Sequence, residues 1–169
     1  MITSASNPKL RLVHRLLESR RQREKEGLFV VEGEDLVQAA EDAGIEPVEL
    51  LRADEDVEPE LLAKVSTMGH PPRVLGIYRR NALPRGVEPV SLALWHVADP
   101  GNLGTILRTA DAFGASVAVS PGCADPTGPK AVRASAGALF RVPLADFDEP
   151  GGTRVALVSH DGRPLAELD

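Results

Sequence analysis

Residues 99–114 read Asp-Pro-Gly-Asn-Leu-Gly-Thr-Ile-Leu-Arg-Thr-Ala-Asp-Ala-Phe-Gly, and an apolar strand is predicted just before them at residues 92–97. The Pro-Gly pair forms a tight turn, and a helix is expected over residues 102–113. Apolar residues recur in this helix at the spacing of one buried face: Leu103, Ile106, Leu107, Ala110 and Phe113. Arg108 lies off that face, so it is available to bind an anionic or ribose-phosphate ligand at the turn. The alternative is a surface ion pair between Arg108 and Asp111.

The composition favours a globular protein of one ordinary domain or two small ones, since 43% of the 169 residues are hydrophobic. The sequence contains no apolar run of about 20 residues, which a membrane span needs, and no signal-peptide core at its beginning. Cys123 is the only cysteine, which excludes an intrachain disulfide and a thiolate metal cluster. The four histidines are scattered along the chain. We therefore expect a cytoplasmic protein without a membrane segment or a bound metal.

Charge is unevenly distributed along the chain, although the net charge is only −6. Residues 9–25 carry seven basic and two acidic side chains, whereas residues 41–60 carry nine acidic side chains and one arginine. Such segregation is typical of a basic patch on an otherwise acidic protein. A helix is expected over residues 7–26, with Ser4, Ser6 and Asn7 as candidate caps and Pro8 near its first turn. Its basic residues either form a solvated face or, as we predict, contact RNA phosphates: Lys9, Arg11, Arg15, Arg20, Arg21 and Arg23.

Strands and helices alternate along the chain, which predicts an α/β fold with two parts. Residues 1–80 are expected to form a small α/β domain, with strands at residues 28–31, 48–51 and 74–78 and helices at residues 35–43 and 59–66. Residues 81–90 contain two prolines and a glycine and are interpreted as a linker. Residues 91–169 are expected to form a parallel-sheet domain, with strands at residues 92–97, 116–120, 140–143 and 155–160 and helices at residues 102–113 and 129–139. Ligands of such sheets bind at the carboxyl ends of the strands.

A second informative stretch, residues 129–138, reads Pro-Lys-Ala-Val-Arg-Ala-Ser-Ala-Gly-Ala and predicts a helix that another backbone can approach closely. Lys130 and Arg133 share one face of this helix, because they are three residues apart. Two interpretations stay open for this stretch. Either the helix packs tightly on the sheet while Ser135 bonds back to a carbonyl, or Lys130, Arg133 and Ser135 face RNA or a cofactor.

Taken together, these motifs resemble one known family. Residues 99–114 are similar to the first signature motif of the SpoU (TrmH) RNA ribose 2′-O-methyltransferases of the SPOUT class, and residues 130–137, followed by residues 140–143, are similar to the family's next segment. Near the N-terminus, residues 6–9 and 29–33 resemble the L30e-like substrate-binding domain of its ribosomal-RNA members. The resemblance covers nearly the whole chain and implies an L30e-like domain followed by a SPOUT methyltransferase domain.

The resemblance implies transfer of a methyl group from S-adenosyl-L-methionine to a ribose 2′-hydroxyl, with 23S ribosomal RNA as the favoured substrate. By residue match, Arg108 is the catalytic arginine and Asn102 its companion, while Arg133 and Ser135 are supporting residues that face the substrate. Family members generally work as homodimers, in which Arg108 reaches the cofactor pocket of the neighbouring subunit. A guanidinium group ordinarily has a pKa above about 12, and neutralising it near pH 7 costs roughly 8 kcal/mol. Arg108 is therefore either a general base or a charged group that orients the ribose and its phosphate.

The sequence also departs from the family pattern. The family's cofactor pocket uses a later loop with glycine and glutamate and a Ser-Leu-Asn segment, which form a trefoil knot, and the 169 residues contain neither motif. We therefore expect this chain to be the front part of a methyltransferase, which alone binds S-adenosyl-L-methionine poorly and does not turn over. Of the residues present, Ser159 and His160 are expected beside the cofactor. The alternatives are a non-catalytic RNA-binding module and a nucleotide-binding α/β enzyme unrelated to methylation.

Overall fold

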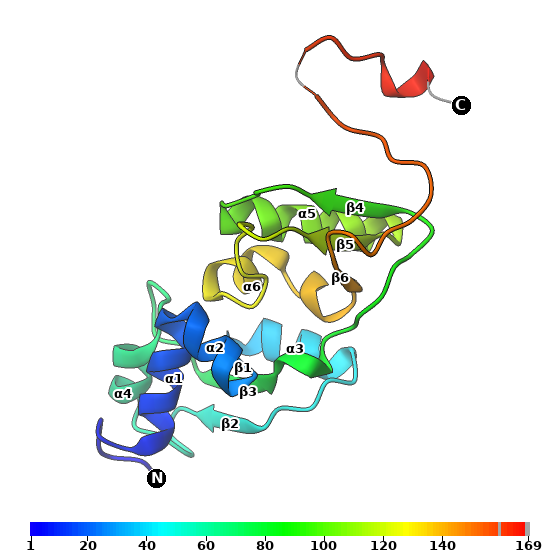
Figure 1. Cartoon of the computed structure of the whole chain (residues 1–169). Helices are drawn as coiled ribbons and strands as arrows, with labels where there is room; N and C mark the ends of the chain where they lie inside the picture. The colour runs from blue at the N-terminus through cyan, green and yellow to red at the C-terminus, as the bar shows by residue number, and fades with distance from the viewer. Residues whose placement is uncertain (159, 168–169) are drawn as a thin grey trace.

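The computed structural model describes residues 1–158 and 160–167, which form two three-stranded sheets with helices packed on them (Figure 1). The first half of the molecule, residues 1–80, holds a sheet in the order β1-β3-β2. The second half, residues 91–167, holds a sheet in the order β4-β5-β6. The predicted α/β class is confirmed, and so is the parallel sheet of the second half. Over the described residues, no helix is long and apolar enough to cross a membrane.

The sheet of the first half is antiparallel. Its elements are α1 (Pro8–Glu18), α2 (Arg20–Glu26), β1 (Leu28–Glu32), α3 (Glu34–Asp42), β2 (Glu49–Arg52), α4 (Pro59–Val65), β3 (Val74–Arg79) and a 3-10 turn (Arg80–Ala82). The central strand β3 pairs with both neighbours, so that Val30 lies opposite Ile77 and Leu51 lies opposite Leu75. These four side chains are buried in one apolar cluster, to which α1 and α4 contribute their apolar faces.

The prediction of a single helix over residues 7–26 is wrong, because the helix is interrupted at Ser19, which separates α1 from α2. Ser19 has an extended backbone, and its side chain accepts a hydrogen bond from the backbone N–H of Gln22. Serine caps a new helix more readily than it continues an old one, because its side chain competes for backbone groups. Of the candidate caps Ser4, Ser6 and Asn7, the structure uses Asn7, which accepts a hydrogen bond from the N–H of Lys9, and Pro8 occupies the first turn as predicted.

The second half places one long helix beside its parallel sheet. Its elements are β4 (Ser91–Leu94), α5 (Pro100–Phe113), β5 (Ser116–Val119), α6 (Pro129–Ser135), a 3-10 turn (Ala138–Phe140), β6 (Leu144–Asp146) and a second 3-10 turn (Leu165–Glu167). Leu103, Leu107 and Ala110 of α5 are buried as predicted, whereas Phe113 is 81% exposed. At about 100° per residue, Phe113 lies roughly 80° around the helix from Leu103, at the edge of the buried face.

Three of the predicted strands differ from the structure. β4 ends before residues 95–97, because His96 takes a left-handed conformation with φ of 53°. The strand expected at residues 140–143 lies at residues 144–146 instead, because left-handed Ala136 and Gly137 end α6 early and lead into a 3-10 turn.

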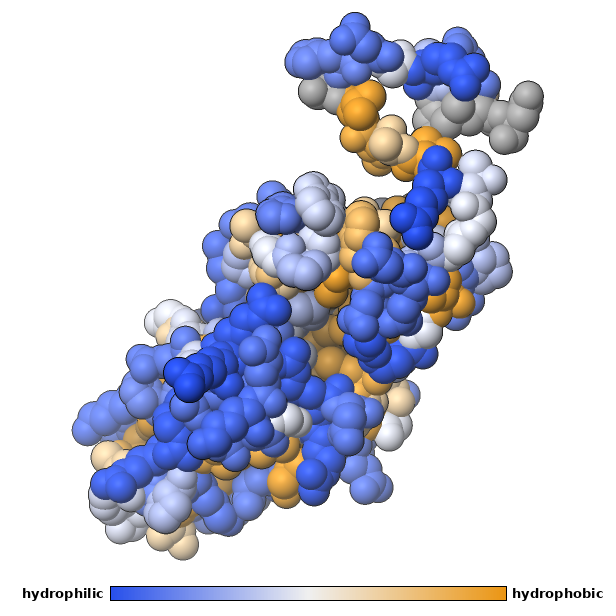
Figure 2. Space-filling view, viewed as in Figure 1, coloured by the Kyte–Doolittle hydropathy of each residue, from blue (hydrophilic) through white to orange (hydrophobic). Residues whose placement is uncertain are grey.

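The third difference concerns the strand expected at residues 155–160, which is absent over its described residues. Residues 155–158 are exposed and belong to a segment that leaves the body of the molecule after β6 (Figure 1). Apolar side chains recur along this segment, whereas hydrophilic side chains cover most of the visible face of the first half (Figure 2). A short apolar run becomes a strand only where another strand pairs with it, and residues 155–158 have no such partner among the described residues.

The helices α5 and α6 cross with their backbones close together at Gly104. A Cβ atom at residue 104 would lie 2.7 Å from the carbonyl carbon of Ala134 and 2.8 Å from the backbone nitrogen of Ser135. Side chains cannot occupy such short contacts, so only glycine permits this crossing. Arg108 follows Gly104 by one helical turn, and its position is therefore set by the same crossing.

The two halves share an apolar core, so they are joined by direct contacts as well as by the linker. The rings of Tyr78 in β3 and Phe140 in the second half lie 6.2 Å apart, and both belong to one buried cluster. The predicted linker also runs beside β6: the N–H of Leu144 donates to the carbonyl of Pro84, and the N–H of Gly86 donates to the carbonyl of Leu144. These contacts fix the first half relative to the second.

A buried ion pair adds to this junction. The Nε of Arg23 in α2 lies 2.7 Å from Oδ2 of Asp125, which follows β5, and both side chains are almost fully buried. Burial alone would raise the pKa of the Asp125 carboxyl, but hydrogen bonds from Arg23 and Thr127 outweigh burial and lower that pKa below its ordinary value. The ionised form of Asp125 therefore stabilises the contact between the halves.

Gly104→Ala tests the helix crossing. Helix propensity alone favours alanine by about 1 kcal/mol. Because the added methyl has no room against Ala134, we expect overpacking to lower the free energy of unfolding by about 2 kcal/mol instead. Urea unfolding followed by circular dichroism measures the change. Gly151→Ala is the control, since a Cβ at residue 151 meets nothing within 4 Å. Equal or greater stability in Gly104→Ala would contradict the close crossing.

Asp125→Asn tests the buried ion pair. Because the pKa of Asp125 is lowered by folding, its contribution is present above the ordinary carboxyl pKa and is lost as the pH falls through the lowered value. We expect Asp125→Asn to lower the free energy of unfolding by about 3 kcal/mol at pH 7, since Arg23 is left buried without a carboxylate. The difference from the unsubstituted protein should shrink below about pH 4.

The pH series is run with Asp148→Asn as the control, because Asp148 is exposed. A difference between Asp125→Asn and the unsubstituted protein that is the same at pH 3 and pH 7 would show that ionisation of Asp125 does not stabilise the junction.

Candidate functional site

The helix α5 begins at the carboxyl edge of the parallel sheet, where Asp99 caps it. Oδ1 of Asp99 accepts a 2.8 Å hydrogen bond from the backbone N–H of Asn102, and Oδ2 lies 3.7 Å from Nζ of Lys130. The hydrogen bond from Asn102 and the charge of Lys130 lower the pKa of the Asp99 carboxyl. The carboxylate of Asp99 thus occupies part of the turn at which an external anion was predicted to bind. The side chain of Asn102 is exposed beside it.

Arg108 is exposed on α5, and within the described residues it forms no hydrogen bond or ion pair. The alternative pair with Asp111 is wrong, because Asp111 binds Arg141 with 2.6 Å between Oδ2 and Nη2. The Nε of Arg141 also donates to this carboxylate, so the contact is a two-pronged fork. Arg108 is therefore available to an external ligand, and its catalytic role stays a prediction.

The three residues of α6 expected to face RNA take different positions. Lys130 is exposed at the start of the helix. Arg133 turns toward the first half, where its Nη1 lies 2.5 Å from Oε2 of Glu32 and 2.6 Å from Oγ1 of Thr67. Ser135 is buried, and its Oγ donates a 2.7 Å hydrogen bond to the carbonyl three residues earlier. The expectation that Ser135 faces RNA is thus corrected, and the alternative of a back-bonding serine is confirmed.

The basic residues of α1 and α2 that were predicted to contact RNA fall into three groups: some pair with carboxylates, one is buried, and the others are exposed without an ion partner among the described residues. Lys9 and Arg20 are exposed but bind Glu49 and Glu24 at 2.9 Å and 2.8 Å. The expectation that Arg23 contacts RNA is corrected, because its side chain is 6% exposed and is held by a carboxylate of the second half. Three of the arginines of α1 and α2 predicted to contact RNA are exposed and form no ion pair in the part of the chain that the structure describes, and we call them the exposed arginine set: Arg11, Arg15 and Arg21.

The residues expected beside a cofactor are Ser159 and His160. Ser159 lies outside the described residues, and His160 is exposed. Among residues 1–158 and 160–167, no three histidine, cysteine, aspartate or glutamate side chains gather in a way that could hold a metal ion. Cys123 is buried, and its thiol donates to the carbonyl of Leu94 at 3.4 Å.

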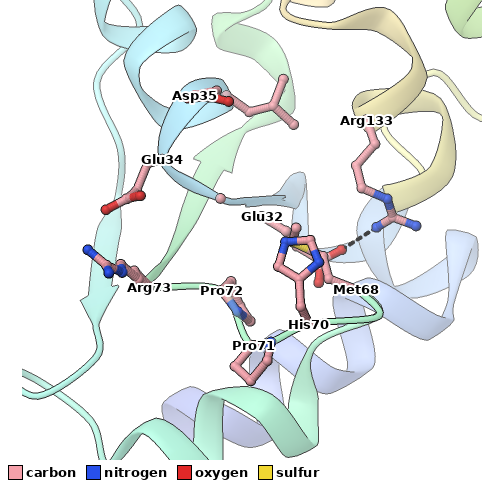
Figure 3. Close-up of a pocket in the computed structure, with 11 residues that line it drawn as sticks. Glu32, Glu34, Asp35, Met68, His70, Pro71, Pro72, Arg73 and Arg133 are labelled. Carbon is pink, nitrogen blue, oxygen red and sulfur yellow. Dashed lines mark hydrogen bonds and ion pairs between the residues drawn. The ribbon is translucent and has the colours of Figure 1, made fainter.

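A pocket of about 370 Å³ opens where the two halves meet (Figure 3). We call it the junction pocket, and it is lined by residues 32–36, 68, 70–73 and 133. This pocket was not predicted from the sequence, because its walls come from three segments that are far apart in the chain. The available signal was Glu32, a carboxylate at the end of an apolar strand. A second hollow of about 500 Å³ is lined by residues 44–48, 79 and 82.

Comparison with known proteins gives two family matches. Residues 89–163 match the SpoU rRNA Methylase family, and residues 7–70 match the MRM3-like substrate binding domain. The chain is 35% identical to an uncharacterized tRNA/rRNA methyltransferase of Synechocystis, in an alignment that covers 67% of this chain and 46% of that protein. It is 30% identical to the 23S rRNA (guanosine(2553)-2′-O)-methyltransferase RlmP of Bacillus subtilis, over 88% of this chain and 66% of that protein.

Among solved structures, the AdoMet-bound rRNA methyltransferase from Sinorhizobium meliloti superposes with a TM-score of 0.74 at 28% identity. That superposition covers 86% of this chain and 63% of the other. This chain thus spans about half the length of the first curated relatives, between 43% and 46% of each. From the two family matches and this structural likeness, we conclude that the chain belongs to the SpoU (TrmH) family.

Proposed function

We propose that the full-length gene product containing this chain transfers a methyl group to a ribose 2′-hydroxyl of ribosomal RNA, with 23S ribosomal RNA as the favoured substrate. The main support is Arg108, which lies in the segment that matches the SpoU family and is exposed without an ion partner among the described residues. The name of the Bacillus subtilis relative, a 2′-O-methyltransferase of 23S ribosomal RNA, adds support.

The proposed methyl donor is S-adenosyl-L-methionine, which supplies the methyl group when it is bound. The support is the solved relative from Sinorhizobium meliloti, which holds this cofactor. In the chain itself, the junction pocket and the second hollow are lined by neither the start of α5 nor His160. Neither hollow therefore includes His160, the described residue expected beside the cofactor, and Arg108 and Asn102 are assigned to the substrate side of the reaction.

The geometry favours an orienting role for Arg108 over the role of a general base. Loss of a proton from a guanidinium is favoured by burial and by nearby cations. Arg108 is exposed instead, and α5 holds it on a rigid element packed on the sheet. A charged fork in that position can hold a ribose and the adjacent phosphate in line for methyl transfer.

The exposed arginine set is proposed to grip RNA phosphates while the second half presents the target ribose. The support is that these residues lie within or beside the match to a substrate-binding domain and keep their charges free among the described residues. A homodimer and a cytoplasmic location are part of the same proposal. The homodimer rests on the family resemblance, which implies that Arg108 works at the cofactor pocket of a neighbouring subunit, and the cytoplasmic location is supported by the likeness to a bacterial ribosomal-RNA methyltransferase.

Arg108→Lys tests the catalytic assignment in the full-length gene product. Lysine keeps the charge but loses the planar fork, so we expect at least a 100-fold loss of methyl transfer with unchanged RNA affinity. Incorporation of labelled methyl groups into ribosomal RNA measures the rate, and Arg52→Lys is the matched control at another exposed arginine. Full activity in Arg108→Lys would exclude both proposed roles of this residue. RNA binding without methyl transfer in the unsubstituted protein would favour the non-catalytic RNA-binding module.

Replacing the exposed arginine set by alanine tests the RNA contacts. Each lost phosphate contact lowers the steepness of the dependence of log affinity on log salt by about 0.7 to 0.9. We therefore expect the triple variant to lower that slope by about 2, as measured by fluorescence anisotropy with labelled ribosomal RNA fragments at several salt concentrations. A variant with an unaltered slope would place the RNA elsewhere, and Arg52→Ala shows the effect of removing one unrelated exposed charge.

A further inference from the structure

The junction pocket is built from residues that the proposed catalytic site and the exposed arginine set do not use. Its volume of about 370 Å³ lies within the range of small-ligand sites. Figure 3 shows Arg133 on one side of this pocket and Arg73 with Glu34 on the opposite side, with residues 70–72 between them. Both halves of the molecule therefore contribute charged side chains to one concave surface.

Glu32 holds Arg133 in a fixed position at the rim of the pocket. The Glu32 side chain is 1% exposed, and its carboxylate accepts hydrogen bonds from Ser66, Thr67 and Arg133. A buried carboxylate held by several donors has few alternative arrangements, so the guanidinium is preorganised. Among the described residues, Nε and Nη2 of Arg133 donate no hydrogen bond, and a third of the side chain is exposed. These groups can donate to a ligand without releasing Glu32.

The other walls of the pocket combine apolar surface with hydrogen-bonding groups of both kinds. Met68 and Pro71 offer apolar surface, Arg73 offers donors, and Glu34 and Asp35 offer acceptors. An unstacked nucleobase has the matching chemistry, because its flat face packs on apolar side chains and its edge carries N–H donors and carbonyl acceptors. A bare phosphate matches less well, since it meets carboxylates in the same space.

We propose that the junction pocket takes one unstacked nucleobase of the RNA substrate. This inference rests on the proposed function, since it assumes that RNA is the ligand of this chain. The fixed guanidinium of Arg133 and the side chain of Arg73 donate to carbonyl or ring-nitrogen acceptors of the base, while Glu34 and Asp35 accept from its amino or imino groups. The pocket thereby recognises one base of the RNA strand at the place where the two halves of the protein meet.

The two methionines of the chain provide a direct test, because Met68 lines the pocket whereas Met1 is 76% exposed and lies outside it. Labelling the methionine methyl groups with ¹³C gives two signals, which Met68→Leu assigns. We expect nucleoside 5′-monophosphates to shift the Met68 signal in a saturable way and to leave the Met1 signal in place. No shift at Met68, or the same shift with inorganic phosphate alone, would overturn the proposal.

Arg73→Ala tests the same pocket with RNA. We expect this variant to bind a single-stranded RNA about tenfold more weakly, because the base loses the hydrogen-bond donors of Arg73. Binding of a duplex of the same sequence should not change. Arg52→Ala is the matched control, since Arg52 is exposed on the same half but lies outside the pocket.

These outcomes separate the two proposals. If the unsubstituted protein binds neither the single strand nor the duplex, the proposed function fails, and the inference fails with it. If it binds RNA but Arg73→Ala and Arg52→Ala behave alike, only the nucleobase pocket is excluded.

Discussion

The missing side chain at residue 104 is the constraint on which the arrangement of this molecule depends. Because Gly104 has no Cβ, the backbone of α6 lies against α5 at Ala134 and Ser135. The next turn of α5 carries Arg108 at the surface, and the residue before Ala134 is Arg133, which turns toward the first half. One close helix contact thus places a free arginine on one element and a paired arginine on the other.

The helix α6 and the loop that precedes it join the two halves. Arg133 binds the buried carboxylate of Glu32, and Asp125 binds the buried guanidinium of Arg23. Buried ion pairs contribute little net stability compared with apolar residues. They nevertheless fix the relative position of their partners, because separating the two partners leaves uncompensated buried charges. The exposed arginine set and Arg108 therefore keep fixed relative positions, as a protein needs if it grips a strand at one point and modifies it at another.

Local patterns in the sequence predicted what local physics determines. The start of α1 at Asn7 and Pro8, the buried face of α5 and the parallel sheet followed from capping residues, apolar spacing and continuous apolar strands. The pairs Arg23–Asp125 and Arg133–Glu32 could not be predicted from the sequence, because their members are about a hundred residues apart and no local pattern links them.

The end of the chain shows a second limit of such predictions. The apolar residues 155–158 look like a strand but find no partner strand among the described residues. In the candidate site, Arg108 lies exposed off the buried face of α5, as the apolar spacing predicted. Ser135 does not, because its hydroxyl bonds back within α6.

Under the proposed function, the face of α5 around Arg108 meets the ribose that is modified. A hydroxyl-radical source tethered at Ala112→Cys, one turn beyond Arg108 on exposed α5, tests this claim, and buried Cys123 does not compete for the label. We expect strand cleavage centred on the nucleotide that carries the methyl group, and none there from a source at Lys64→Cys on α4. The same cleavage pattern from both positions, or cleavage far from the methylated nucleotide, would contradict it.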